Sequence, residues 1–148
     1  IISGYDADNL PDYGCGKGTL KEALLSNAYP DFDIREYDPA IPGKEEPPEP
    51  ADIVSCTDVF EHLEIAFLDN VLKDLQRLTR KALLVTVAMG PAKKTLADGR
   101  NAHLIQKDTR WWLNRILPFF RLRQYNVLAG DQGEDPYEFL AVLEPLDA

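Results

Sequence analysis

Three glycines at alternating positions, Gly14, Gly16 and Gly18, stand between two segments of different hydrophobic periodicity. Residues 9–13 before them are predicted to form a short strand, and residues 19–27 after them carry apolar side chains at helical spacing. At such a strand-to-helix turn, glycines let backbone N–H groups approach a ligand and the helix N-terminus adds partial positive charge. The glycine cluster therefore predicts a nucleotide-type binding loop.

The spacing of the glycines separates the classes of nucleotide ligand. A dinucleotide fingerprint needs a glycine where this chain has Thr19 or Lys21, so NAD is disfavoured. A Walker loop needs a glycine at the position of Pro11 and a hydroxyl residue at the position of Gly18. ATP bound through a Walker loop is therefore excluded.

The rest of the chain alternates predicted strands with predicted helices. Further strands are expected at residues 32–37, 51–56 and 82–88, and helices at 67–78, ended by residues 79–81, and at 108–117. Two final strands at 119–128 and 137–143 flank a turn-rich loop and should pair antiparallel. This order predicts one domain over residues 1–148 with an open, mostly parallel α/β sheet that binds ligands at the carboxyl ends of its strands.

Charge and hydropathy indicate which partners to expect. The formal net charge is −9, although residues 73–123 are rich in Lys and Arg. This balance disfavours nucleic acid as a partner without excluding it, because affinity for a polyanion depends on neutralising its phosphates. No apolar run approaches the roughly 20 residues that cross a bilayer, and no signal peptide is visible, so we expect no membrane partner and a cytoplasmic location.

The two cysteines, Cys15 and Cys56, are expected to be small buried thiols at the ends of adjacent strands. No group of residues has the spacing of a zinc site, so no metal is expected. Of the tryptophan pair Trp111 and Trp112, one is expected in the core and the other over the edge of a helix.

Three motifs in order resemble the class I S-adenosylmethionine-dependent methyltransferases, over the chain from about Leu10 to Leu146. The first is an acid followed by G-x-G-x-G, from Asp12 to Gly18, and the second is Asp38, at the spacing of the acid that holds the ribose. The third, residues 52–63, is similar to the D-V-L-E-H-L segment of many members. The resemblance implies a Rossmann-like sheet with a C-terminal antiparallel hairpin.

The resemblance also implies a site for S-adenosylmethionine. Asp12 would face the methionine amino group, the glycine loop would hold the methionine portion, and Asp38 would hold the ribose. The cofactor residues expected on this basis are Asp12, Gly14, Cys15, Gly16, Gly18, Asp38, Thr57 and Asp58.

The chain departs from the family between Asp38 and Asp52. The short stretch there cannot hold the usual helix, strand and helix, because one crossover alone needs about a dozen residues. We therefore expect a sheet that lacks one edge strand. The adenine pocket then has to use residues 41–50 or the segment after Cys56.

Two histidines are candidates for a general base in methyl transfer, a role suited to imidazole at neutral pH. His103, in a polar loop at the ligand end of the sheet, is favoured over His62, which stands where a helix begins. Each histidine also has a non-catalytic interpretation. His62 can cap the helix or hydrogen-bond to the backbone, and His103 can belong to an ordinary surface loop. The expected acceptor-binding residues are Glu61, Lys93, Lys94, Arg100 and Asn101, and the basic ones favour a small acceptor with phosphate or carboxylate.

Two other functions remain open at this point. The truncation after Asp38 would suit a noncatalytic S-adenosylmethionine-binding module or regulatory subunit. An aminopropyl transferase would use the decarboxylated form of the same sulfonium.

Overall fold

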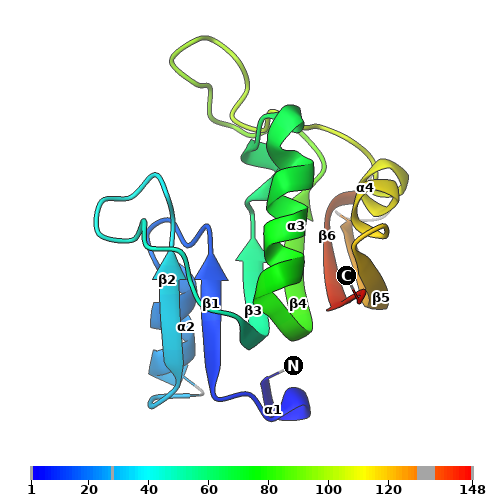
Figure 1. Ribbon diagram of the computed structural model, residues 1–148. Helices are drawn as coiled ribbons and strands as arrows, with labels where there is room; N and C mark the ends of the chain where they lie inside the picture. Colours follow the sequence, from blue (N-terminus) through cyan, green and yellow to red (C-terminus); the bar gives the residue numbers. More distant parts are fainter. Residues whose placement is uncertain (1, 28, 130–135, 148) are drawn as a thin grey trace.

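The computed structural model describes residues 2–27, 29–129 and 136–147. One six-stranded sheet has the order β2-β1-β3-β4-β6-β5 (Figure 1). β2, β1, β3 and β4 run parallel, β6 is antiparallel to β4, and β5 is antiparallel to β6. This confirms the Rossmann-like, mostly parallel sheet with a C-terminal hairpin. The strands are β1 (Asn9–Tyr13), β2 (Asp33–Tyr37), β3 (Ala51–Thr57), β4 (Thr79–Ala88), β5 (Phe120–Ala129) and β6 (Pro136–Pro145).

β2 forms one edge of the sheet, as expected for a fold without its outermost strand. Residues 38–50 form neither a helix nor a strand and lead directly from β2 to β3. In Figure 1 this segment makes a long loop at the carboxyl ends of the parallel strands before it returns to the start of β3. The loop therefore lies at the edge of the sheet where ligands are expected.

The helices cover the two faces of the sheet unequally. The helical elements are α1 (Ile2–Tyr5), α2 (Thr19–Asn27), the 3-10 turns η1 (Phe60–His62) and η2 (Ile65–Phe67), α3 (Leu68–Leu78) and α4 (Thr109–Ile116). α3 and α4 pack on one face and contribute six fully buried side chains between them. α2 packs on the other face without a fully buried side chain. The first face therefore holds most of the core.

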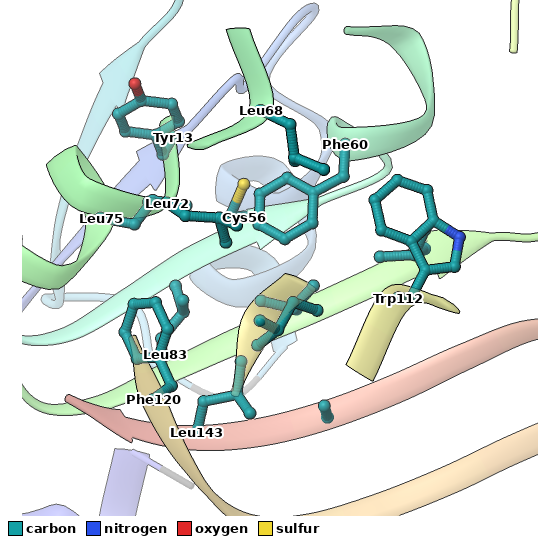
Figure 2. Packing of buried hydrophobic residues seen from close by; sticks show 14 of the residues in the cluster. Tyr13, Cys56, Phe60, Leu68, Leu72, Leu75, Leu83, Trp112, Phe120 and Leu143 are labelled. Carbon is teal, nitrogen blue, oxygen red and sulfur yellow. The ribbon is translucent and has the colours of Figure 1, made fainter. Parts of the chain in front are cut away.

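The main core gathers around η1, α3 and α4 (Figure 2). Phe60 is 1% exposed, and its ring stacks on Trp112 with 6.2 Å between centroids. The side chain of Asp108 caps α4 by accepting a hydrogen bond from the Trp111 N–H group. Trp112 is buried, whereas Trp111 is half-buried and receives the cation of Arg115 over its ring, so the expected division of the tryptophan pair is confirmed.

Some boundaries differ from the sequence predictions. β4 begins at Thr79 rather than at residue 82, because Thr79 ends α3 and at once pairs with Ala51 of β3. Phe67, expected on the apolar face of a helix, precedes α3 and is 59% exposed. α1 is too short to show a periodic pattern. Most of the predicted turn between the last two strands lies outside the described residues.

No helix in the described part of the chain has the length and hydropathy needed to cross a membrane.

Candidate cofactor and acceptor site

The glycine loop connects β1 to α2 at the carboxyl edge of the sheet. All three glycines have positive φ angles, of 76°, 51° and 83° in chain order. A Cβ atom at Gly14 would collide with Val59, and one at Gly18 would collide with the Glu36 carboxylate. At Gly16 the same atom would meet nothing within 4 Å. Gly16 therefore faces open space, where a ligand can approach its backbone.

Asp38, the expected ribose acid, directly follows β2 and contacts the glycine loop. Its Oδ2 accepts a hydrogen bond from the Gly16 N–H group at 3.0 Å, and its Oδ1 accepts one from Ala40 at 2.9 Å. A carboxylate has about four acceptor positions, so both oxygens can accept a further bond from a hydroxyl group. The fold thus brings the first two sequence motifs into direct contact.

Asp12, at the end of β1, is 3% exposed. Burial, together with the nearby Glu36, raises the pKa of its carboxyl to about 6, although the Ser55 side chain and Lys44 lower it in part. A buried carboxylate is stabilised by a nearby cation. Asp12 directly precedes the glycine loop, so a cationic group bound beside it would stabilise its carboxylate.

Lys44 is a residue of this region that sequence reasoning missed. Its Nζ donates to Glu36 Oε1 at 2.9 Å and to the Gly16 carbonyl at 3.1 Å. The Asp38 N–H group bonds to the Lys44 carbonyl at 2.8 Å. These contacts fold residues 38–50 onto the glycine loop, in place of the absent strand. The available signal was a single base in a stretch of acids and prolines.

The end of β3 forms the neighbouring wall of the site. Asp58 has a φ of 55°, and its N–H group bonds to the Thr86 carbonyl at 3.2 Å. Thr57 is half-buried and Asp58 is exposed, and Val59 beyond them contacts the glycine loop at Gly14. The structure thus places both expected cofactor residues beside the loop.

Both cysteines are free thiols, and β1 and β3 are neighbours as predicted. Cys56 is buried, but Cys15 is only half-buried because it lies in the glycine loop. Burial raises the pKa of both thiols.

His62 and His103, far apart in the sequence, lie side by side. Their ring centroids are 4.9 Å apart and the rings meet edge to face. His62 Nδ1 is 2.8 Å from the Ala102 carbonyl, and His103 Nδ1 is 2.7 Å from the Gly90 carbonyl. Because a carbonyl only accepts hydrogen bonds, Nδ1 carries the hydrogen in both rings. In the neutral rings the lone pair is therefore on Nε2.

Glu61 precedes His62 in η1 and is fully buried. Its Oε1 accepts a hydrogen bond from the Ala88 N–H group at 2.9 Å. Its Oε2 accepts none from the residues that the structure describes. Burial raises the pKa of this carboxyl, and the bond from Ala88 partly offsets that effect.

The loop between β4 and α4 supplies the other expected acceptor residues. Asn101 braces the loop, since its Oδ1 accepts from the N–H groups of Ala92 and His103. Arg100 pairs with Glu64 at 2.7 Å and with Asp98 at 2.8 Å. Lys93 and Lys94 are exposed. The positive charge of Arg100 is thus largely neutralised, which leaves the two lysines as the freer cations among these residues.

A pocket of about 470 Å³ opens between this loop and η2. It is lined by Glu64, Ile65, Arg100, Asn101, His103, Leu104, Ile105, Gln106 and Lys107. The pocket contains three of the expected catalytic and acceptor-binding residues. His62 does not line this pocket but contacts His103, which does.

No protein-family model matches the chain, and no curated protein matches its sequence. Its fold is similar to those of many solved structures. The methyltransferase domain of the bacterial protein CtHen1-CN has a TM-score of 0.66 at 17% identity, over 97% of this chain and 93% of that one. The N-methyltransferase NodS from Bradyrhizobium japonicum WM9, in complex with S-adenosyl-L-homocysteine, has a TM-score of 0.65 at 10% identity, over 99% and 82%.

A type 11 methyltransferase from Sulfolobus solfataricus, described as putative, has a TM-score of 0.61 at 15% identity, over 100% of this chain and 90% of that one. At these identities the likeness concerns the fold. The chain therefore has the Rossmann-like fold that these methyltransferases share.

Proposed function

We propose that this domain binds S-adenosylmethionine at the glycine loop and transfers its methyl group to a small acceptor. The observation that supports this most is the hydrogen bond from the Gly16 N–H group to Asp38, in the loop that directly follows the buried Asp12. The fold thus brings together a glycine loop with open space at Gly16, a carboxylate for hydroxyl groups and, next to the loop in the chain, a buried carboxylate for a cation. The methionine portion, ribose and ammonium group of S-adenosylmethionine match these three features.

Methyl transfer from a sulfonium is an in-line displacement that depends mainly on alignment, to which positioning can contribute about 7–11 kcal/mol. The acceptor would enter the pocket lined by His103. Val59 lies against Gly14 and directly precedes η1, and His62 of η1 contacts His103, so these residues link the pocket to the glycine loop. A neutral His103 or His62 could take the proton of a hydroxyl or ammonium acceptor at Nε2. His103 is the stronger candidate because it lines the pocket directly.

We further propose that the methyl acceptor carries a phosphate or carboxylate group. Its support is Lys93, Lys94 and Lys107, because Arg100 is already paired with two carboxylates. Charge reversal at Lys93 and Lys94 should raise the KM of such an acceptor and leave the affinity for S-adenosylmethionine unchanged. An unchanged KM would contradict the anionic acceptor.

Thermal unfolding with added ligand tests the cofactor. S-adenosylmethionine or S-adenosylhomocysteine at about 100 times Kd should add about 2.7 kcal/mol, which corresponds to roughly 5–10 °C for a domain of this size, whereas NAD should add nothing. Asp38→Ala should abolish the shift, and Asp31→Ala, at an exposed position, should retain it. If neither sulfur ligand shifts the unfolding temperature, the domain does not bind this cofactor.

Turnover and ligand preference test the remaining functions. Tight binding without transfer to any acceptor would favour the noncatalytic module. Preference for decarboxylated S-adenosylmethionine would favour an aminopropyl transferase.

A further inference from the structure

Three potential metal ligands converge where η1 meets the loop that follows β4. One side-chain ligand atom each from Glu61, His62 and His103 lies within 4.8 Å of the other two. Ligands at 2.0–2.2 Å from one ion lie about 3–3.5 Å apart, so small side-chain rotations would close the cluster around an ion. A backbone bond of 3.0 Å between Ile105 N–H and the Glu61 carbonyl holds the two segments together.

The two imidazoles are oriented as metal ligands usually are. Each ring donates its Nδ1 hydrogen to a backbone carbonyl, at 2.8 Å for His62 and 2.7 Å for His103. Such a bond fixes the tautomer and the ring plane, so that the lone pair of Nε2 is available to an ion. His62 is exposed and His103 half-buried, which gives an ion access from solvent.

The carboxylate of Glu61 lacks a partner that its burial demands. One oxygen accepts a hydrogen bond from Ala88, while Oε2 is buried without a hydrogen bond from the described residues. A buried carboxylate that is only half satisfied is costly, and a nearby cation removes that cost. Glu61 is next to His62 in the chain, and one oxygen of its carboxylate clusters with a nitrogen of each ring.

We propose that Glu61, His62 and His103 bind a divalent transition-metal ion such as Zn²⁺ or Mn²⁺. Two imidazoles and one carboxylate suit these ions, whereas Mg²⁺ prefers a shell of oxygen atoms. Three protein ligands leave at least one coordination position open, and His103 places it beside the 470 Å³ pocket. The ion would occupy the lone pairs that a general base needs, so the two roles of the histidines exclude each other. Ion binding itself does not depend on the proposed methyl transfer.

Calorimetric titration of the EDTA-treated protein tests this proposal without any cofactor present. We expect one Zn²⁺ or Mn²⁺ ion per chain and at least tenfold weaker binding of Mg²⁺. Co²⁺ should give visible absorption bands without the strong thiolate band of a cysteine ligand. Absence of stoichiometric Zn²⁺ and Mn²⁺ binding would overturn the proposal.

Matched variants separate an ion site from a structural cluster. In His62→Asn and His103→Asn, the amide nitrogen can keep the bond that Nδ1 makes, but Nε2 is gone. Glu61→Gln keeps the shape of the side chain and removes its charge. Each variant should remain folded, as judged by circular dichroism, and bind the ion at least about 100-fold more weakly. Loss of a residue that only hydrogen-bonds to a metal ligand already weakens binding by about 10–100-fold.

Cys15→Ser is the control, because Cys15 is the more accessible thiol. This variant should bind the ion as the unmodified protein does. Unchanged affinity in the histidine and Glu61 variants, or loss of binding in Cys15→Ser, would place the ion elsewhere. Failure of ion binding would leave the S-adenosylmethionine titration unaffected, so the two proposals fail separately.

Discussion

The glycine loop and the histidine cluster lie at the same edge of the sheet but are built differently. Most of the loop's own geometry arises from residues 14–18, whose glycines adopt left-handed conformations. The cluster joins η1 to a loop that is distant in the sequence, and it depends on the packing that holds them together. The conformation of the glycine loop itself is therefore mainly local in sequence, whereas the histidine cluster is a product of the tertiary fold.

The largest loss of stability is expected from Phe60→Ala, which removes the packing that holds η1 in place. Phe60 anchors η1 in the core by stacking on Trp112, and removing such a ring costs about 3–5 kcal/mol. Thermal unfolding should therefore shift downward by about 6–20 °C. Phe67→Ala, at a side chain that is 59% exposed, should change stability by less than about 0.5 kcal/mol. Equal effects of the two substitutions would contradict the role of η1 packing.

The next effect concerns Asp12, whose folded pKa of about 6 lies above its unfolded value of about 3.9. The folded state binds more protons between these values, so this group lowers stability as pH rises from about 4 to about 6. Asp12→Asn should stabilise the ligand-free domain above pH 6 by up to about 3 kcal/mol and have no such effect below pH 4. It should also weaken S-adenosylhomocysteine binding.

Urea unfolding of Asp12→Asn and of the unmodified protein across this pH range measures the difference in their free energies of unfolding. Asp31→Asn, at an exposed position, is the control and should leave the pH profile unchanged. If Asp12→Asn is less stable than the unmodified protein at pH 8, the ionised Asp12 carboxylate does not destabilise the folded domain.

A smaller effect on stability, but a specific one on binding, is expected from Gly16→Ala. Gly16 and Gly99 both have positive φ angles and open space at the Cβ position, so alanine should cost each about 1–2 kcal/mol. Only Gly16 faces the proposed cofactor. Calorimetry should show at least tenfold weaker S-adenosylhomocysteine binding for Gly16→Ala and unchanged binding for Gly99→Ala. Equal affinity of the two variants for S-adenosylhomocysteine would mean that the cofactor does not bind at the glycine loop.

The smallest effect is expected from Arg100→Ala. Its guanidinium forms ion pairs at the surface, which contribute less than about 1 kcal/mol. The neighbouring Asn101→Ala should cost more, because Asn101 holds three backbone groups of the loop. Chemical unfolding of both variants gives the order. A larger loss for Arg100→Ala would show that charge, rather than the asparagine brace, maintains the loop.

The sequence predicts the elements whose signals are local. The glycine loop and the bounds of α2 follow from glycine spacing and hydrophobic periodicity, and the short stretch after Asp38 predicts the missing strand. The start of β4 is missed because Thr79 satisfies both the end of a helix and the first pair of a strand.

The histidine cluster is the part of the candidate site that residue spacing in the sequence does not predict. His62 and His103 are separate candidates in the sequence, and no pattern relates them to each other or to the free oxygen of Glu61. The contacts of Lys44 with the glycine loop are equally hidden, since they depend on how residues 38–50 fold back. These arrangements result from tertiary packing, which a one-dimensional pattern does not encode.

A backbone amide NMR titration with S-adenosylhomocysteine would locate the ligand residue by residue. We expect chemical-shift changes concentrated at Gly14, Gly16, Gly18 and Asp38, with smaller ones at Thr57 and Asp58. A protein without shift changes, or with changes confined to the region from Lys107 to the end of α4, would contradict a cofactor site at the glycine loop.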